Sequence, residues 1–309
     1  MGSVFLVGLV LRLTYLYFAL DHLGMEGFWK RAPDTRVYLT VANEILGGAP
    51  LGQYSLFRVG PGYGFILAAI KTVFGSAPIY SLLFSVLMGG LAPVAVYLFA
   101  FSLFRRKRLA LASSLISAFS ITSISLSCYI LTDQTYFTMQ CLALVMFVEG
   151  LRRAGIGWFI ASGLLTGAAA LVRPSGQLWP LIFLVIPFLV PVPDAFHSRR
   201  KFIRLAVLTG ILSLAIVSSW SVRNYAVTGV FTFGSNGMLT LRNCMVSQVE
   251  ADGNNDEVVR LRNAYIKEDG DLGPEYANAY TLARARVWST VKEKPGEFIH
   301  YYFLNLWNN

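Results

Sequence analysis

Charged residues are scarce in this chain. They make up 14% of its 309 residues, and 55% of the residues are hydrophobic. A soluble domain carries about 25% charged residues. This composition excludes an ordinary soluble enzyme and a disordered or collagen-like chain. For a membrane protein, the length suits a single helical bundle of about seven or eight spans, each of about 20 residues.

Cysteine, histidine and nucleotide-binding motifs are also sparse or absent. The three cysteines form an odd count, which indicates no disulfide framework. The three histidines are scattered, and no metal-binding spacing is present, so we expect no metal ligands among them. The sequence contains no P-loop, no G-x-G-x-x-G after a strand and no G-x-S-x-G. These absences argue against a cytosolic enzyme that uses nucleotides.

Long apolar runs are what the chain has instead. We expect a transmembrane module of seven spans over residues 1–220, followed by a partly helical extracytoplasmic segment over 221–297. An eighth apolar stretch, 298–309, is too short to span a bilayer, so we expect the chain to be cut off inside a helix of a longer protein. The seven runs are Val4–Leu20, Ile79–Phe104, Leu109–Ile130, Phe137–Gly150, Trp158–Val172, Gln177–Val192 and Leu205–Trp220.

Basic residues gather after every second run. The clusters are Arg105–Arg108, Arg152–Arg153 and Arg199–Arg204. If successive spans alternate in direction, all three clusters lie on one side of the membrane, and the positive-inside rule makes that side the cytoplasm. This interpretation accounts for the net charge of +9 without a nucleic-acid partner. The opposite side then receives a long first loop, about 21–78, and the segment 221–297.

The outer loops have helical patterns of their own. Asp34–Gly47 alternates polar and apolar residues as a short helix would. Tyr63–Phe74 is apolar enough to lie along the interface as an amphipathic helix. In the later segment, we expect helix over parts of 256–292.

Two aspartates on the outer side are candidate catalytic carboxylates. Asp34 follows a proline at the start of a predicted helix, and Asp133 lies between two apolar runs. A helix N-cap is the simpler role for either residue. An acidic group at the edge of a membrane span is nevertheless costly, and such groups are often functional. Both interpretations stay open from the local sequence.

Arginines on the same side are candidate anion-binding residues. Arg58, Arg173 and Arg223 each lie near the end of an apolar run or within the first loop. A guanidinium matches the geometry of a phosphate with forked donors. The alternative is that these side chains snorkel to the interface. Arg12 lies inside the first span, and we expect it to face the bundle interior.

Several stretches together resemble the GT-C class of membrane glycosyltransferases. The resemblance is to the family 39-like enzymes, which include protein O-mannosyltransferases and the lipid A aminoarabinose transferase. Each stretch is weak alone, but five in the same order are specific. The stretches are Pro33–Tyr38 with Ala42-Asn43, Phe57–Tyr63, Gly163–Pro174, Trp220–Tyr225 with Gly229, and Lys294–Trp307.

The resemblance implies a fold, a donor and roles for residues. The implied fold is an all-α polytopic bundle with interfacial helices in the first outer loop. The implied donor is a polyprenyl-phosphate sugar, and the acceptor would be a lipid, a glycan or a protein of the envelope. Asp34 and Asp133 would be catalytic, and Arg58, Arg173 and Arg223 would bind the donor phosphate. Tyr38, Tyr63 and Asn224 lie in the same motifs and would line the substrate pocket.

The chain departs from the family pattern at some positions. Thr35 follows Asp34 where many protein mannosyltransferases have Glu, and Val59 and Gly60 precede Pro61 where prolines are usual. The chain therefore looks more like the bacterial members, in an inner membrane, than like the eukaryotic ones. The resemblance implies no particular cofactor. A requirement for a divalent cation stays open, because members of the wider class differ in metal dependence.

Two other functions are compatible with the same composition. A flippase or transporter of lipid-linked glycan precursors would have a similar bundle, but it should show a repeat or paired broken spans. No convincing pair is visible in the sequence. A polysaccharide polymerase or ligase would also act on polyprenyl carriers, but as diphosphate-linked saccharides. Consumption of a monophosphate-linked sugar separates these classes.

Overall fold

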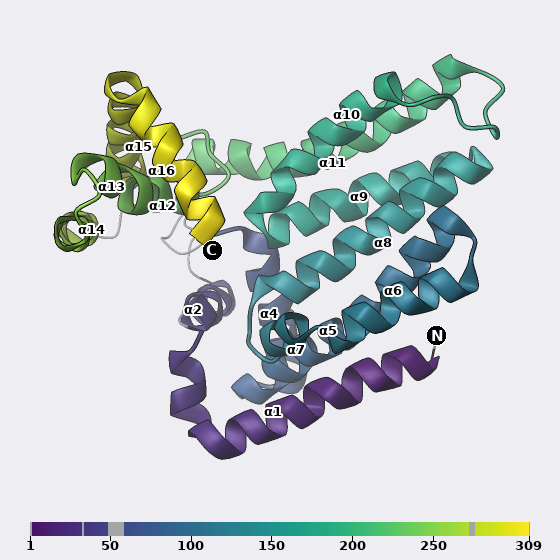
Figure 1. Cartoon of the computed structure of the whole chain (residues 1–309), viewed down its shortest axis with the longest axis horizontal. Coiled ribbons are helices and arrows are strands. Elements are labelled where there is room, and N and C mark those ends of the chain that lie inside the picture. The colour runs from purple at the N-terminus through teal and green to yellow at the C-terminus, as the bar shows by residue number, and fades with distance from the viewer. Residues whose placement is uncertain (1, 33, 49–58, 272–275, 309) are drawn as a thin grey trace. The chain divides into compact units, whose positions relative to one another are not determined.

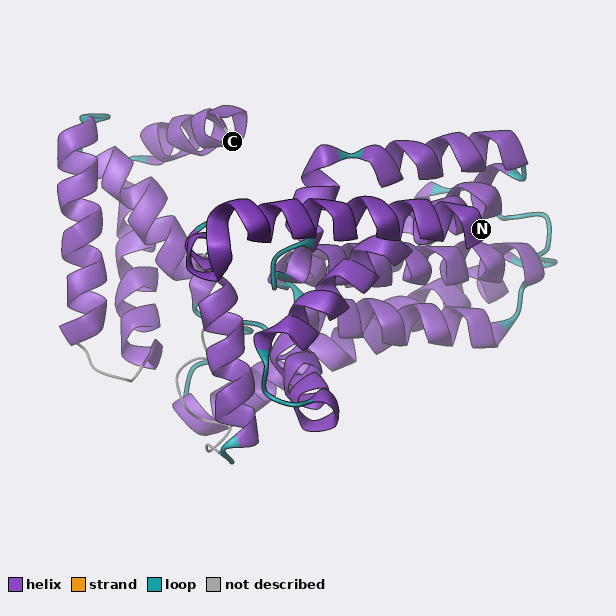
Figure 2. Cartoon of the chain, turned by 90° about the horizontal axis from the view of Figure 1, so that it is seen from below, coloured by secondary structure: helices purple, strands orange, loops and turns teal. Residues whose placement is uncertain are grey.

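The computed structural model describes residues 2–32, 34–48, 59–271 and 276–308, and over these residues the chain forms helices and no strand (Figures 1 and 2). The chain divides into two compact units, one holding residues 2–48 and 60–220 and the other holding the described part of 221–308. The first unit carries the apolar helices, so the protein is an all-α polytopic helical bundle, as the composition predicts.

The helices of the first unit lie over the seven predicted apolar runs. The neighbouring pairs α1–α5, α5–α6, α5–α8 and α8–α9 pack directly against each other, and Figure 1 shows α8 and α9 running alongside one another. The helices are α1 (Gly2–Lys30), α5 (Pro78–Phe104), α6 (Lys107–Phe119), α7 (Ile121–Ser127), α8 (Thr132–Arg153), α9 (Ile156–Val172), the 3-10 turn η1 (Pro174–Leu178), α10 (Trp179–Leu189) and α11 (Arg199–Thr228), whose last residues belong to the second unit.

Three helical segments of the described chain are long and apolar enough to cross a membrane: Gly2–Gly24, Pro78–Phe104 and Arg199–Thr228. A fourth span is obtained if the bent pair α6–α7 is counted as one, and α9 and α10 are apolar but shorter. Seven spans therefore stay a prediction.

The third apolar run is not the continuous helix that the sequence predicts. It breaks at Ser120 into α6 and α7, which meet at a bend of 59°. Ser120 has an extended backbone, and its hydroxyl accepts a hydrogen bond from the Ser123 amide at the start of α7. Because a serine side chain can cap a helix, the break costs little even within an apolar run.

Small residues allow close packing between α9 and α11. A Cβ added at Gly163 would lie 2.9 Å from the Thr209 carbonyl oxygen, and one at Gly167 would lie 2.7 Å from Ile216. The Ser213 hydroxyl donates to the Gly163 carbonyl oxygen at 3.0 Å. Lipid tails are as apolar as helix surfaces, so the hydrophobic effect contributes little to helix association in a membrane. Helices associate there through close packing of small residues and through interhelical hydrogen bonds. The two glycines of the Gly163–Pro174 motif therefore hold the bundle together.

Arg12 of α1 faces the bundle interior, as predicted. Its side chain is fully buried, and it donates from Nη1 to the Gly8 carbonyl oxygen at 2.9 Å and from Nη2 to the Ser123 hydroxyl at 2.8 Å. Gly89 of α5 provides the space, because a Cβ there would lie 2.7 Å from Nε of Arg12. The partner of this arginine is therefore a set of hydroxyl and carbonyl groups.

The segment between α1 and α5 contains the two predicted helices, α2 (Asp34–Leu46) and α4 (Pro61–Phe74). They pack on each other through Gly64, where a Cβ would collide with Val41. The Lys71 ammonium donates to the Asn43 side-chain oxygen at 2.6 Å and ties the two helices further. This helical pair carries the aspartate motif and the Pro–aromatic motif on one compact element.

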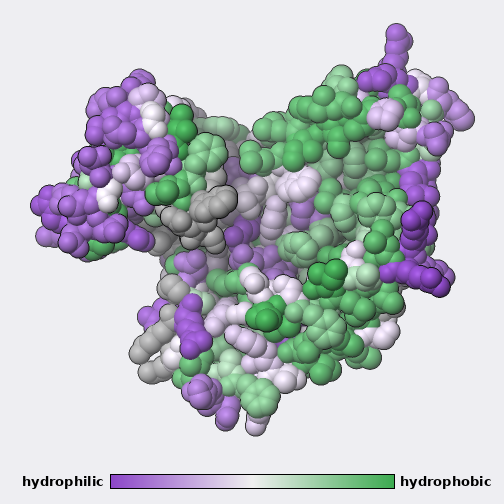
Figure 3. All heavy atoms as spheres, viewed as in Figure 1, coloured by the Kyte–Doolittle hydropathy of each residue, from purple (hydrophilic) through white to green (hydrophobic). Residues whose placement is uncertain are grey.

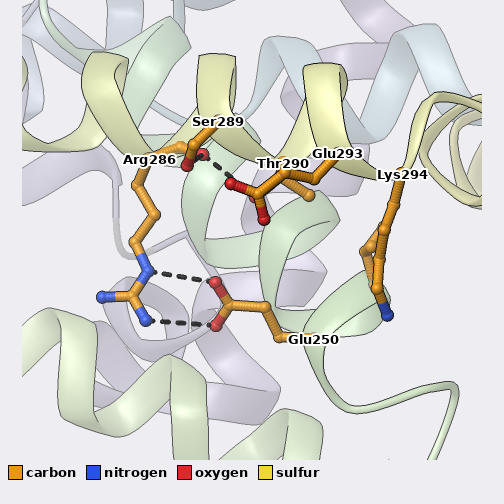
Figure 4. Close-up of a pocket in the computed structure, with 7 residues that line it drawn as sticks. Glu250, Arg286, Ser289, Thr290, Glu293 and Lys294 are labelled. Atoms are coloured by element: carbon orange, nitrogen blue, oxygen red, sulfur yellow. Dashed lines mark hydrogen bonds and ion pairs between the residues drawn. The ribbon is translucent and has the colours of Figure 1, made fainter.

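The second unit is a cluster of short helices held by polar contacts. Buried Arg242 donates to Asp269 at 2.5 Å, and its guanidinium lies 5.0 Å from the centroid of the Tyr265 ring. Figure 4 shows Arg286 forked on Glu250, at 3.0 and 3.3 Å. Helices α14 and α15 cover parts of 256–292. The helices are α12 (Asn236–Thr240), a π-helical turn (Leu241–Val246), α13 (Ser247–Glu250), α14 (Asn255–Asp271), α15 (Tyr276–Glu293) and α16 (Pro295–Asn308).

Candidate active site

The first unit has two polar ends. One, the basic end, contains the clusters Arg105–Arg108, Arg152–Arg153 and Arg199–Arg204 at helix ends, and Figure 3 shows hydrophilic residues along that edge of the bundle. At the other, the carboxylate end, the starts of α2, α4 and α8 meet the end of α9. The carboxylate end holds most of the predicted site residues of this unit.

An ion pair joins α8 to α9 at the carboxylate end. The Arg173 Nη1 lies 2.6 Å from a carboxylate oxygen of Asp133 and donates to the Thr132 hydroxyl at 3.1 Å. Leu131 occupies the N-cap position of α8, so Asp133 is in the first helical turn and the N-cap interpretation of this residue is wrong. The side chains of Arg173 and Asp133 are 37% and 28% exposed, so a ligand can reach both.

Tyr38 of α2 joins this pair through Thr132. Its hydroxyl hydrogen-bonds with the Thr132 side chain, and its ring meets the ring of Tyr63 edge to face, with centroids 5.2 Å apart. Tyr63 is fully buried and shares a hydrogen bond of 3.0 Å with Ser85, so it forms the floor beneath Tyr38. Burial, above all, raises the pKa of Tyr38, so its phenol stays protonated at neutral pH.

Asp34 lies one helical turn before Tyr38. It is exposed in the first turn of α2, where a carboxylate is stabilised by the helix dipole. The charges of Asp34 and Asp133 both act to raise the Tyr38 pKa, and that of Arg173 acts to lower it. The two candidate carboxylates and the arginine therefore lie within electrostatic range of one hydroxyl.

The backbone around Asp34 is held by its neighbour. The Thr35 hydroxyl donates to the Ile130 carbonyl oxygen at 3.3 Å, and the Thr35 amide donates to the Ala32 carbonyl oxygen at 3.0 Å. Ile130 precedes α8 by two residues, so this contact fixes the start of α2 against the start of α8. Sequence reasoning missed Thr35, Thr132 and Ser85, because a lone hydroxyl beside an aspartate or within an apolar run carries no signal of its own.

The Pro–aromatic motif touches the Arg–Pro motif. A Cβ at Gly62 would lie 2.8 Å from backbone atoms of Leu171 and Val172, so only glycine lets the first turn of α4 approach the end of α9 so closely. Arg173 follows directly. Arg58, the candidate donor-phosphate ligand of this motif, lies outside the described residues.

Arg223 and Asn224 belong to the second unit. The Asn224 amide donates to the carbonyl oxygens of Thr232 and Phe233 at 2.9 and 3.1 Å, and its oxygen accepts from Arg223 Nη1 at 2.8 Å. Asn224 is fully buried, so it holds the loop after α11 and orients the Arg223 guanidinium. In the described part of the chain, no group of three or more His, Cys, Asp or Glu side chains could hold a metal ion.

The arrangement at the carboxylate end combines acid–base and anion-binding groups. Exposed Asp34 can accept a proton, and the partly exposed Arg173 can contact an anion while Asp133 and Thr132 fix its position. Tyr38 supplies a protonated hydroxyl between them. This set suits group transfer with an anionic leaving group.

Comparison with known proteins supports the same chemistry. The family described as dolichyl-phosphate-mannose-protein mannosyltransferase matches residues 58–222, which is more than half of the chain. The match includes Tyr63, Asp133 and Arg173, whereas the motifs around Asp34 and beyond residue 222 lie outside it. No curated protein and no solved structure matches the chain. The chain therefore belongs to the dolichyl-phosphate-mannose-protein mannosyltransferase family of GT-C membrane glycosyltransferases.

Proposed function

We propose that the protein transfers a sugar from a polyprenyl-phosphate donor to a lipid, glycan or protein acceptor at the extracytoplasmic face of a bacterial inner membrane. The observation that carries this proposal is the grouping of Asp34, Asp133 and Arg173 around Tyr38. The donor, the acceptor and the membrane side go beyond the family membership, and they rest on this grouping and on the distribution of basic loops.

Asp34 is the proposed general base. A hydroxyl of the acceptor attacks the anomeric carbon, the new bond from the acceptor oxygen to that carbon forms, and the bond from the carbon to the phosphate oxygen breaks. The acceptor proton goes to Asp34, which is exposed and therefore accessible to an acceptor. The electron pair of the broken bond leaves with the polyprenyl phosphate.

Arg173 is the proposed ligand of the departing phosphate. Negative charge grows on this phosphate in the transition state, so a cation already in place stabilises the transition state more than the ground state. Asp133 and Thr132 keep Arg173 oriented through Nη1. Arg58 and Arg223 are proposed as further phosphate ligands, with Asn224 orienting Arg223. Tyr38 and Tyr63 would form one wall of the substrate pocket.

The direct test uses purified protein and a synthetic polyprenyl-phosphate sugar with a labelled sugar. We expect release of free polyprenyl phosphate together with loss of label from the lipid. A protein that consumes only diphosphate-linked saccharide would instead be a polymerase or ligase. A protein that moves labelled lipid across vesicles without cleaving it would be a flippase.

The membrane side is tested by cysteine labelling in intact cells. In a background without Cys128, Cys141 and Cys244, single cysteines replacing Asp34, Asp133, Arg173 or Arg223 should react with an impermeant thiol reagent. Cysteines replacing Arg106 or Arg200, at the basic end, should not react. Labelling of the second group alone would invert the topology.

A further inference from the structure

A cavity of about 700 Å³ opens at the basic end of the first unit, away from the residues of the candidate active site. Its walls come from α5, α8, α10, α11 and the loop 190–195, and most of them are apolar: Leu103, Phe147, Leu151, Ile186, Val190 and Phe202. We propose that this cavity binds an anionic phospholipid of the surrounding membrane, with an acyl chain against the apolar walls and the phosphate at the rim.

Arg152 is the cationic side chain of this cavity. Its Nη1 donates to the Ser102 carbonyl oxygen at 3.1 Å, which fixes the guanidinium at the rim and leaves its other N–H groups for a ligand. Within the described residues, Arg152 makes no ion pair. A guanidinium in a fixed position presents forked donors that match a phosphate.

The neighbouring arginines leave an excess of positive charge. Glu149 lies between Arg105 at 2.6 Å and Arg153 at 3.0 Å, so one carboxylate serves two guanidinium groups while Arg152 stands beside them. The clusters Arg105–Arg108, at the start of α6, and Arg199–Arg204, at the start of α11, add further basic residues. Basic pockets between membrane helices on the cytoplasmic side are sites for anionic headgroups.

One residue opposes this preference. Asp194 also lines the cavity, and its carboxylate repels an anionic headgroup. The proposal therefore makes predictions of opposite sign: loss of the Arg152 charge should weaken anionic lipid binding, and loss of the Asp194 charge should strengthen it. An ordinary attraction of basic loops to a negative surface would not single out these two residues.

The lipid is preferred to a soluble anion because of the walls. A free phosphate would contact only the rim of the cavity. A phospholipid would also place an acyl chain against the apolar walls, and burial of that apolar surface is favourable. The membrane provides such lipids at high local concentration.

The experiment measures phospholipid retention by native mass spectrometry. Delipidated protein in detergent is titrated with phosphatidylglycerol or phosphatidylcholine of the same chains. We expect phosphatidylglycerol to bind more tightly than phosphatidylcholine. Arg152→Gln should weaken phosphatidylglycerol binding roughly fivefold, since one basic residue near an anionic surface contributes about this factor. Asp194→Asn should make phosphatidylglycerol bind more tightly. Arg108→Gln is the matched control: it removes the same charge from the same end but does not line the cavity, so binding should stay close to that of the parent protein.

Two further variants separate binding from folding. Arg152→Lys keeps the charge and a donor for Ser102, so it should keep most of the phosphatidylglycerol preference. Ile186→Trp fills the cavity without changing charge and should lower retention, with the helical content checked by circular dichroism. Equal affinity for both lipids, equal losses with Arg152→Gln and Arg108→Gln, or weaker binding with Asp194→Asn would each overturn the proposal. Binding of inorganic phosphate with the same variant pattern would reassign the cavity to a soluble anion.

Discussion

The two ends of the helix bundle use arginine–carboxylate ion pairs in different proportions. At the basic end, the Glu149 carboxylate is shared by Arg105 and Arg153. At the carboxylate end, Asp133 pairs with one arginine, Arg173, and the charges of Asp34, Asp133 and Arg173 all act on the Tyr38 hydroxyl. The same side-chain chemistry therefore gives two guanidinium groups for one carboxylate at one end and a one-to-one ion pair at the other.

The two pairs also differ in which partner is exposed. Glu149 is 9% exposed while Arg105 and Arg153 are 38% and 61% exposed, so the basic end presents cations and hides its carboxylate. Asp133 and Arg173 are both partly exposed, so a substrate can reach either. We therefore expect the Glu149 ion pairs to serve stability, and we propose that the Asp133–Arg173 pair contacts a ligand.

The largest effect should follow from Asp34→Asn. Without a carboxylate to accept the proton of the acceptor, the transfer rate should fall by about 10²- to 10⁴-fold, the range for a general base. The rate is measured as polyprenyl phosphate released by purified protein. Asp21→Asn, at an exposed position of α1, is the control that should leave the rate unchanged. A normal rate for the Asp34 variant would remove this residue from the mechanism.

Arg173→Gln tests the other half of the carboxylate end. Loss of a cation that stabilises the leaving phosphate should lower the rate by about 10²-fold or more. Arg173→Lys should recover part of the loss, because the charge remains while the fork is lost. Arg106→Gln at the basic end is the matched control, with an exposed arginine and an expected normal rate. If Arg173→Gln is as active as that control, Arg173 only snorkels to the interface.

Glu149→Gln should change stability and not activity. Removal of this carboxylate charge leaves Arg105 and Arg153 close together without their shared partner, which should lower the free energy of unfolding by about 1 kcal/mol. The loss is small because both arginines are partly or largely exposed to solvent. The measurement is the temperature at which the purified protein loses its monodisperse elution profile, beside the transfer rate of the fraction that remains folded. A large loss of rate in this folded fraction would break the contrast between the two ends.

The smallest effect is expected for Thr132→Val. This change keeps the shape of the side chain but removes the hydroxyl between Arg173 and Tyr38, which should lower the rate by about three- to tenfold, equivalent to about 1 kcal/mol. Thr132→Ser retains the hydroxyl and should be close to normal. Equal rates for the serine and valine variants would show that Thr132 does not position Arg173.

Part of the candidate site was predictable from the sequence, because charge in an apolar chain is conspicuous. Asp133 and Arg173 were visible as isolated charges between apolar runs, and their common side followed from the basic loops. Their direct contact was not predictable, since they are separated by most of α8 and all of α9. The break at Ser120 was missed for a related reason: hydropathy does not report a local serine cap.

The sequence by itself determined that this protein is a helical membrane protein, because it has few charges and continuous apolar runs of the length that a membrane-spanning helix needs, and such a helix satisfies its backbone groups within the segment. The sequence also predicted that the basic clusters lie at one end of the bundle and the candidate carboxylates at the other. This prediction needs only the order of spans and charges along the chain, because successive spans alternate in direction. Only the tertiary structure decided that Thr132 joins Arg173 to Tyr38, that Gly62 brings α4 against α9, and that a carbonyl and a hydroxyl group accept from Nη1 and Nη2 of Arg12. Those contacts depend on which faces of distant helices meet, and packing between helices sets this over the whole bundle.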